Sequence, residues 1–289
     1  MMQSILSIQS HVAFGYVGNR AAVFPLQRLG FDVTVINTVQ FSNHSGYGSL
    51  KGDVFSSEHL RSLIDGIRER GVFPQLNAVL SGYMGDASLG SLIIDVVQEL
   101  KTITPSLIYC CDPVIGDVDR GVFVRPGIGE YFRDHVVPVA DVLTPNQFEL
   151  NFLTGIEINS LNDALRACEA LRARGPHTVL VTSLVLPDTP PHKIQMLLST
   201  ENGTWLIETP RFDIVPAPTG AGDMTAALFL GHLLRHESPV VALEKMAASV
   251  YGIFEETFKT HSRELQIIPA QEEIVAPTHV FKAKSGISV

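Results

Sequence analysis

The chain has 289 residues, of which 45% are hydrophobic and 18% charged, so it can bury a large core and lacks the composition of a disordered protein. Its formal net charge of −9, without a cluster of Lys and Arg, argues against nucleic acid or an anionic membrane as a partner. The first ten residues lack the basic and apolar regions of a secretory signal, and no apolar run is long enough to span a membrane, so we expect a cytoplasmic protein.

Short apolar runs alternate with amphipathic stretches along the first 182 residues. The apolar runs predict strands at 5–9, 33–37, 78–81, 107–112, 142–144 and 178–182. The stretches between them predict helices at 19–29, 56–70, 89–102, 127–135, 147–154 and 161–174. This alternation is typical of parallel strands joined by crossover helices, and almost continuously apolar strands indicate a sheet covered on both faces. We therefore expect an α/β fold with a mostly parallel central sheet.

The pattern changes after residue 182. Segments 194–199 and 204–208 predict an antiparallel hairpin that turns at Asn202-Gly203, and the Pro-rich stretch 187–191 predicts a loop. Two helices are expected at about 222–236 and 240–257. The length allows one large domain or two smaller ones, but no repeat, low-complexity segment or Ser/Gly linker divides the chain. We expect a single domain spanning 1–289.

Polar residues follow each predicted parallel strand. In an open α/β sheet, ligands bind in the crevice at the carboxyl ends of the strands, so these residues are the first candidates for a site. Taken alone, His44 and Tyr83 would be interpreted as structural side chains. In chain order the candidates are Ser10-His11, Ser42-Asn43-His44-Ser45, Gly82-Tyr83, Asp112-Pro113, Thr144-Pro145-Asn146 and Thr182-Ser183.

The strongest local motif is Ala217-Pro-Thr-Gly-Ala-Gly-Asp223, which stands directly before a predicted helix. Its glycines let backbone N–H groups converge, and the helix N-terminus adds partial positive charge, so the turn can form an anion hole. Such a hole suits phosphoryl transfer, in which the protein positions the groups and neutralises charge on the transferred phosphoryl. Asp223 could then accept the proton of an attacking hydroxyl. The alternative is a tight turn with an N-capping Asp.

A second set of acidic residues follows the fourth and fifth predicted strands. Asp112 and Asp117 lie in Asp112-Pro-Val-Ile-Gly-Asp117, and Glu149 lies one turn into the helix after Asn146. Hard oxygen ligands near phosphates suit Mg²⁺, which takes only one or two carboxylates. The alternatives are a strand-ending turn for Asp112 and a helix-capping charge for Glu149. No GxxxxGK[ST] occurs and no GxGxxG follows a strand, so neither a Walker A nor a dinucleotide site is predicted.

In this order and spacing, Asp112–Asp117, Thr144-Pro-Asn-Gln-Phe-Glu149 and the Gly-Ala-Gly-Asp turn resemble the ribokinase superfamily of ATP-dependent small-molecule kinases. That resemblance implies a ribokinase-like three-layer sandwich with helices on both faces of the sheet. Four N-terminal blocks closely resemble the pyridoxal kinase family. They are Ser10-His-Val12, Gly15-Tyr-Val-Gly-Asn-Arg-Ala-Ala22, Val39-Gln-Phe-Ser-Asn-His-Ser-Gly-Tyr-Gly48 and Leu80-Ser-Gly-Tyr83. The resemblance covers the chain from residue 3 to about residue 276.

The resemblance implies ATP-dependent phosphorylation of the 5'-hydroxyl of pyridoxal, and of pyridoxine and pyridoxamine, to give pyridoxal 5'-phosphate or its analogues in vitamin B6 salvage. It makes Asp223 the base and the amides of Gly220, Ala221, Gly222 and Asp223 the stabilisers of the phosphoryl group. It implies Mg²⁺ near Asp112 and Glu149, a monovalent cation such as K⁺, and a homodimer. The implied pyridoxal contacts are Ser10, Val17, Phe41, His44, Ser45, Gly46, Tyr83 and Asp223. The implied ATP contacts are Asp112, Asp117, Thr144, Asn146, Glu149, Thr182, Ser183, Arg211 and Phe212.

Two positions depart from the family pattern, and two other functions are left open. Ala221 stands where Thr or Val is frequent, and Thr182 stands where some bacterial members have Lys. A hydroxymethylpyrimidine kinase is the closest alternative, although such enzymes often have Cys where Asp223 stands here. A non-catalytic pyridoxal phosphate carrier is the alternative from another class, because a fold alone does not guarantee activity.

Overall fold

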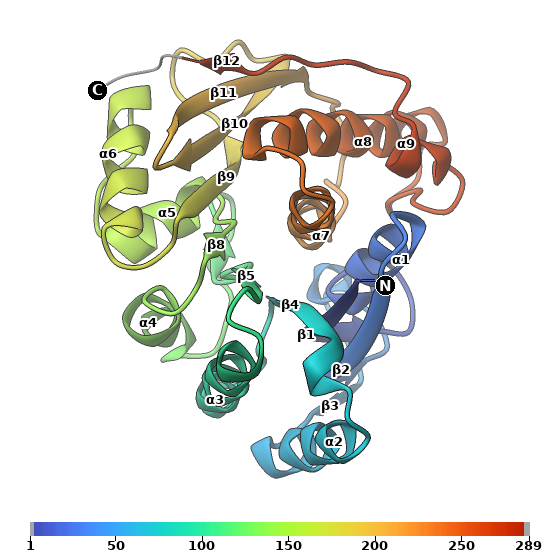
Figure 1. Ribbon diagram of the computed structural model, residues 1–289. Helices are drawn as coiled ribbons and strands as arrows, with labels where there is room; N and C mark the ends of the chain where they lie inside the picture. Colours follow the sequence, from blue (N-terminus) through green and yellow to red (C-terminus); the bar gives the residue numbers. More distant parts are fainter. Residues whose placement is uncertain (1–2, 286–289) are drawn as a thin grey trace.

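A computed structural model describes residues 3–285 of the protein, which form an α/β sandwich around one ten-stranded sheet (Figure 1). The parallel strands are β1 (Ser4–Val12), β2 (Asp32–Phe41), β4 (Leu76–Ser81), β5 (Ile108–Cys111), β8 (Val142–Leu143) and β9 (Thr178–Leu184). Antiparallel strands extend both edges, and they are β3 (Gly52–Val54), β10 (Lys193–Thr200), β11 (Gly203–Pro210) and β12 (Lys284–Ser285). The strand order is β12-β11-β10-β9-β8-β5-β4-β1-β2-β3.

Helices cover both faces of this sheet (Figure 1). On one face lie α1 (Asn19–Arg28), α7 (Ala221–Leu234), α8 (Pro239–Lys259) and α9 (Glu272–Val275). On the other lie α2 (Ser57–Glu69), α3 (Ser88–Ile103), α4 (Ile128–Tyr131), α5 (Gln147–Thr154) and α6 (Leu161–Arg172). A π-helical turn, Phe132–Val136, continues α4, and a separate two-stranded ribbon is formed by β6 (Gly116–Asp117) and β7 (Gly121–Val122).

Alternate residues of the central strands belong to two different cores. In β9, Val179 and Val181 pack with the α2–α6 helices, whereas Leu180 packs with α7 and α8. The same alternation occurs in β4, where Val79 points to the first core and Leu80 to the second. Successive side chains of a strand point to opposite faces, so a sheet buried on both sides requires the continuous apolar runs seen in the sequence.

Side-chain caps fix where several helices begin. Ser56 accepts a hydrogen bond from the amide of His59 at the start of α2, and Ser160 does the same for Asp163 in α6. At α8, Ser238 caps the helix directly before Pro239, whose missing N–H costs nothing in the first turn. These local signals explain why the helix starts were readable from the sequence.

The expected three-layer, mostly parallel architecture is confirmed, and each predicted strand and helix overlaps an observed one. The hairpin at Asn202-Gly203 is also confirmed, as β10 and β11. Seven short elements were not predicted: β3, the β6–β7 ribbon, α9, β12 and two 3-10 turns, Ser45–Tyr47 and Phe73–Gln75. Each has only two to four residues, too few to show a periodicity, and is held in place by the longer elements beside it.

The carboxyl ends of the six parallel strands lie along one edge of the sheet. There the register of β1 against β2 shifts by one residue between Gln9 and His11, because Thr38 and Val39 of β2 together lie opposite Ser10, which makes a bulge in β2. Bulges re-aim a side chain at the end of a strand and are frequent beside active sites. Among the helices formed by residues 3–285, none combines the length and the apolar character needed to cross a membrane.

Candidate active site

The Gly-rich turn, residues 220–223, forms the N-terminus of α7. Gly220 caps the helix in the left-handed conformation, with φ of 85°. A Cβ atom at this position would lie 1.8 Å from the carbonyl oxygen of Tyr16, so only glycine fits. The first amides of a helix lack intrahelical acceptors and carry the positive end of its dipole. The turn therefore has the geometry of an anion hole.

Asp223 stands in the first turn of α7. Its side chain keeps partial contact with solvent, but protein surrounds it at longer range. This desolvation raises the pKa of Asp223 to about 6, while the backbone N–H groups of Gly18 and of Asp223 itself favour the charged form. The carboxylate is then largely ionised at neutral pH, but its pKa is closer to that pH than an ordinary carboxyl's, as a general base requires.

Asp112 lies directly against the Gly-rich turn. A Cβ atom on Gly222 would be 3.7 Å from Asp112 Oδ2, and the hydroxyl of Thr144 donates to Asp112 Oδ1 at 3.1 Å. Asp112 is 5% exposed; burial, followed by the charges of Glu149 and Asp223, raises its pKa well above the ordinary value. Three neighbouring carboxylates with few compensating charges form a site that a cation would stabilise.

Both carboxylate oxygens of Glu149 accept backbone hydrogen bonds, one of which caps α5. Oε1 accepts from the amide of Ile115 and Oε2 from the amide of Asn146, each at 2.9 Å, and the Asn146 side chain completes the capping box. Burial raises the pKa of Glu149 to about 8 although these backbone hydrogen bonds oppose the shift. The capping interpretation of Glu149 is thereby confirmed. Any bound cation would have to share these oxygens or meet them through water.

Asp117 and Asn146 are tied to the β6–β7 ribbon. The Asn146 side chain donates to the carbonyl of Gly116 at 2.8 Å. The carboxylate of Asp117 accepts from the amide of Arg120 at 2.8 Å and from its guanidinium Nε at 2.7 Å. The ribbon therefore lies next to the capped start of α5, and Asp117 faces Arg120.

Two loops approach the Gly-rich turn from the N-terminal half. In the 15–18 turn, a Cβ atom on Gly18 would be 2.4 Å from the hydroxyl of Ser10, so this turn lies directly against Ser10 of β1. In the 44–47 loop, a Cβ atom on Gly46 would be 3.8 Å from the Thr219 methyl group. The structure thus brings Ser10 and Val17, and the loop holding His44, Ser45 and Gly46, to the Gly-rich turn.

Phe41 and Tyr83 lie farther along the same strand ends. Phe41 is half-buried at the end of β2, in register with Val12 of β1. Tyr83 is half-buried after β4, where its carbonyl accepts from the hydroxyl of Thr38 at 2.7 Å. Both residues thus lie close to the register shift between β1 and β2, and part of each side chain is exposed.

Several buried polar atoms at this edge have unused hydrogen-bonding capacity. Within residues 3–285, no partner is found for Gln9 Oε1, His11 Nδ1, His44 Nδ1 and Thr219 Oγ1. Buried polar groups are normally paired, so a group of unpaired ones at the strand ends is typical of a site that receives a polar ligand.

The remaining predicted ATP residues are spread along the sheet toward its β12 edge. Thr182 and Ser183 are half-buried in β9, and the amide of Thr182 donates to the carbonyl of Pro145 at 3.0 Å. Arg211 and Phe212 follow β11, two strands away. Phe212 packs against the rings of Tyr251 and Phe258, with centroids 5.1 and 5.3 Å apart.

Glu264 is a buried residue of the site that the sequence did not reveal. Its Oε1 accepts from the hydroxyl of Tyr47 at 2.8 Å and lies 3.0 Å from His44 Nε2, and its Oε2 accepts from the amide of Tyr16 at 3.1 Å. It follows α8, about 220 residues from the loops it contacts. No motif surrounds it, and its one signal in the sequence is an acid beside the apolar Leu265 and Ile267.

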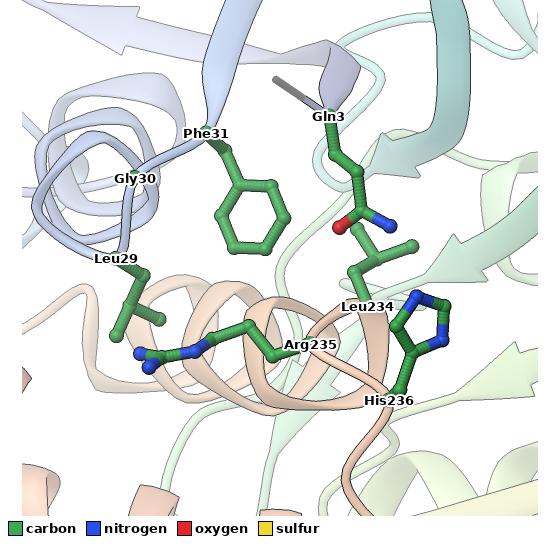
Figure 2. A pocket seen from close by; sticks show the side chains of 7 residues that line it. All are labelled: Gln3, Leu29, Gly30, Phe31, Leu234, Arg235 and His236. Carbon is green, nitrogen blue, oxygen red and sulfur yellow. The ribbon is translucent and has the colours of Figure 1, made fainter. Parts of the chain in front are cut away.

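Two surface hollows lie outside this group of residues. One is formed at the opposite ends of the strands, since Gln3 directly precedes β1 and Phe31 directly precedes β2; Figure 2 shows its side chains. Its lining offers no carboxylate, hydroxyl or thiol side chain, and consists of Gln3, Leu29, Gly30, Phe31, Leu234, Arg235 and His236. The other lies between residues 213–216, just before the Gly-rich turn, and the end of α8 with residues 261–263. The second hollow alone adjoins the candidate site.

Comparisons with known proteins relate the chain to small-molecule kinases. Residues 33–267 match the family model described as phosphomethylpyrimidine kinase. The chain is 52% identical over 282 residues to a protein of Rubrobacter xylanophilus named pyridoxal kinase PdxY, with 97% of each chain covered. It is 47% identical to the protein of the same name from Corynebacterium diphtheriae, with 97% of this chain and 99% of the relative covered.

Solved structures give the same likeness. A pyridoxal kinase from Leishmania donovani in complex with ADP and pyridoxamine is 30% identical, with a TM-score of 0.92 over 98% of this chain and 99% of the other. The complex of the Leishmania donovani enzyme with ADP and pyridoxine gives a TM-score of 0.91 at the same identity and coverage.

Proposed function

This chain belongs to the pyridoxal kinase family, and we propose that its Gly-rich turn, with Asp223 as the base, carries out the phosphoryl transfer. The activity is that of a pyridoxal kinase, which uses ATP to phosphorylate pyridoxal, pyridoxine and pyridoxamine. The observation that carries the proposed roles is the convergence of Asp112, Asp223 and the N-terminus of α7 at the strand ends.

Asp223 removes the proton from the 5'-hydroxyl of the acceptor. The hydroxyl oxygen attacks the γ-phosphorus of ATP, its proton passes to the carboxylate, and the bond from the γ-phosphorus to the bridging oxygen breaks to release ADP. The raised pKa of Asp223 suits this task because the base must be ionised before transfer and able to hold a proton afterwards. A positioned general base of this kind contributes about 10² to 10⁴ in rate.

The amides of residues 220–223 stabilise the transferring phosphoryl group. In phosphoryl transfer, negative charge is spread over the equatorial oxygens, and fixed N–H dipoles at a helix N-terminus meet it without reorganisation. Because the contact is made by backbone, Ala221 serves as well as a residue with a larger side chain. The close approach of Tyr16 to Gly220 holds the turn in its conformation.

Asp112 and Glu149 are the proposed residues that face Mg²⁺. Among residues 3–285, no three His, Cys, Asp or Glu side chains form a group able to hold a metal alone. That suits an ion brought in by the nucleotide, since Mg²⁺ usually combines one or two carboxylates with phosphate oxygens and water. When bound, Mg²⁺ would neutralise charge on the phosphates. Asp112 has a free Oδ2, whereas Glu149 would act through water. Dependence of the rate on K⁺ is part of the same proposal.

The acceptor is proposed to lie between Ser10, near the end of β1, and the 44–47 loop. The unpaired polar atoms at Gln9, His11, His44 and Thr219 support this location. Partly buried aromatic rings can cover the faces of a pyridine ring. The proposed contacts are Ser10, Val17, Phe41, His44, Ser45, Gly46 and Tyr83.

ATP is proposed to lie along the strand ends from β5 toward β11. The hollow before the Gly-rich turn shares Phe258 with the ring cluster of Phe212, which supports an adenine position near Arg211 and Phe212. The proposed contacts are Asp112, Asp117, Thr144, Asn146, Glu149, Thr182, Ser183, Arg211 and Phe212. We also propose that the chain forms a single domain and assembles as a homodimer. Light scattering of the purified protein measures the oligomeric state.

Turnover with a panel of acceptors tests the function. Purified protein is mixed with Mg-ATP and, separately, with pyridoxal, pyridoxine, pyridoxamine and hydroxymethylpyrimidine, while ADP and the phosphorylated product are followed. We expect turnover with the three B6 vitamers. Turnover with hydroxymethylpyrimidine alone would reassign the substrate, and vitamer binding without ADP release would identify a carrier.

A further inference from the structure

Glu264 is held by a rigid part of the fold. The residues that follow it, Leu265 and Ile267, are completely buried in the core between the sheet and the α7–α8 layer. Its own backbone is fixed through Ser262, whose hydroxyl donates to the Glu264 carbonyl at 2.7 Å and accepts from its amide at 3.1 Å. The carboxylate is therefore presented from a fixed position.

This carboxylate joins two loops that are distant in the sequence. Oε1 meets Tyr47 Oη and His44 Nε2 in the 44–47 loop, and Oε2 accepts from the amide of Tyr16 in the 15–18 turn. The Glu264 carboxylate lies so close to the 15–18 turn that a side chain at Gly15 would not fit, because a Cβ atom there would be 2.6 Å from Oε2. All three partners are donors, so the acceptor-only carboxylate satisfies them together.

The neighbouring Arg263 strengthens the same connection. Its guanidinium lies 3.8 Å from the ring centroid of Tyr47 and donates a hydrogen bond to the carbonyl of Gly46. Two adjacent residues after α8 thus hold the 44–47 loop. Glu264 binds the side chains of His44 and Tyr47, and Arg263 binds the carbonyl of Gly46 and the face of the Tyr47 ring.

The 15–18 turn transmits this position to the Gly-rich turn. The carbonyl of Tyr16 packs against Gly220, the Gly18 backbone packs against Ser10, and the Gly18 amide is one of the groups that stabilise the Asp223 carboxylate. Displacement of Tyr16 would therefore move the pocket wall and the surroundings of the base together.

We infer that Glu264 is a positioning residue that sets the acceptor pocket against the Gly-rich turn, an inference that rests on the proposed role of Asp223. It also orients His44. With Nε2–H donated to Glu264, the other ring nitrogen, Nδ1, is an acceptor that is buried without a partner in the described structure. In the neutral tautomer this nitrogen lies against Gly46, where a Cβ atom would be 2.9 Å from it.

Glu264→Gln is the direct test, because it keeps the shape and replaces one acceptor oxygen by a donor group that opposes its partners. Loss of a hydrogen bond to a charged group corresponds to about a 10- to 100-fold effect, which we expect in kcat/KM for pyridoxal. The KM for Mg-ATP should stay within about twofold, because no ATP contact is altered. Glu272→Gln is the matched control, since Glu272 follows on the same segment and its exposed carboxylate pairs only with Arg28.

A merely structural role gives a different result. Loss of kcat in proportion to the folded fraction, with the KM for pyridoxal and for ATP unchanged, would overturn the inference, as would wild-type kinetics. If Glu264→Gln does not fold, Tyr47→Phe takes its place, since it removes one hydroxyl from a partly exposed side chain. We then expect about a 3- to 10-fold loss of kcat/KM for pyridoxal, and no loss would again overturn the inference.

A double-mutant cycle separates this contact from other effects. Because Glu264→Gln and Tyr47→Phe break the same contact, the double variant should lose less than the product of the two single losses. Fully multiplicative losses would contradict the coupling. Failure of the proposed base is recognised separately, because it would appear as retained turnover in Asp223→Asn whatever the Glu264 variants do to pyridoxal affinity.

Discussion

Gly220→Ala is expected to abolish most of the turnover while leaving the protein folded. The new methyl group would lie 1.8 Å from the carbonyl oxygen of Tyr16, whereas real contacts of this kind are at least 3.0 Å. The Gly-rich turn and the 15–18 turn must therefore move apart. The displacement is about 1 Å, and a misplacement of that size near reacting atoms costs about 10²-fold in rate. The left-handed φ of 85° adds about 1–2 kcal/mol of instability for a residue with a Cβ atom.

Gly30→Ala separates these two effects. Gly30 also has a left-handed φ, of 96°, but a Cβ atom there meets nothing within 4 Å, and it lies at the opposite ends of the strands. This control should lose about 1–2 kcal/mol of stability, a decrease in Tm of roughly 2–8 °C, and keep its kcat.

The assay is kcat for pyridoxal at saturating Mg-ATP, together with thermal unfolding of each variant. The left-handed backbone conformation should lower the stability of both variants by a similar amount. Only Gly220→Ala should show the further loss of stability from the clash and the loss of turnover. Wild-type turnover in Gly220→Ala, or an equal loss of turnover in Gly30→Ala, would refute the reasoning.

Two further predictions concern pH. Because the base must be ionised, kcat/KM should rise with pH up to a pKa of about 6, that of Asp223, and then level off; a profile flat from pH 5 to 8 would contradict this role. Stability without ligand should change in the opposite sense. Glu149 has a folded-state pKa of about 8 against an ordinary 4.5, so the folded protein binds the proton of Glu149 more tightly than the unfolded chain does. The free energy of unfolding therefore falls as pH rises between these values. Thermal unfolding across this range measures the slope, which Glu149→Gln should reduce, and an unchanged slope in that variant would assign it to other groups.

The sheet was predictable because its strands are buried on both faces. A run such as Val179–Val181 must be apolar at every position, and three of the helices between strands, α2, α5 and α6, begin at Ser or Asn caps that a sequence displays. The β6–β7 ribbon and β12 have two residues in each strand, and their pairing depends on the surrounding tertiary structure. The strand β8 is equally short, with two residues, but it was predicted because Val142 and Leu143 form an apolar run, which β6, β7 and β12 lack.

The candidate site was predictable where its residues form local motifs. The Gly-rich turn, Asp112 and Glu149 each stand at a strand end or helix start, so their neighbours in sequence are also their neighbours in space. Glu264 differs because its partners Tyr16 and Tyr47 lie more than 200 residues away, and the contact exists only once the segment after α8 packs beside the first two strands. The capping of α5 by Glu149 was among the interpretations of the sequence, but the contact of its other oxygen with the amide of Ile115 required the structure, because Ile115 lies 34 residues away.

The most direct test of the proposed mechanism is the turnover of Asp223→Asn. The amide keeps the size of the side chain and the N-terminus of α7 but cannot accept the proton. We expect pyridoxal and Mg-ATP to bind as in the wild type, with kcat lowered at least ~10²-fold. Turnover within about twofold of the wild type, at unchanged stability, would contradict the assignment of Asp223 as the base.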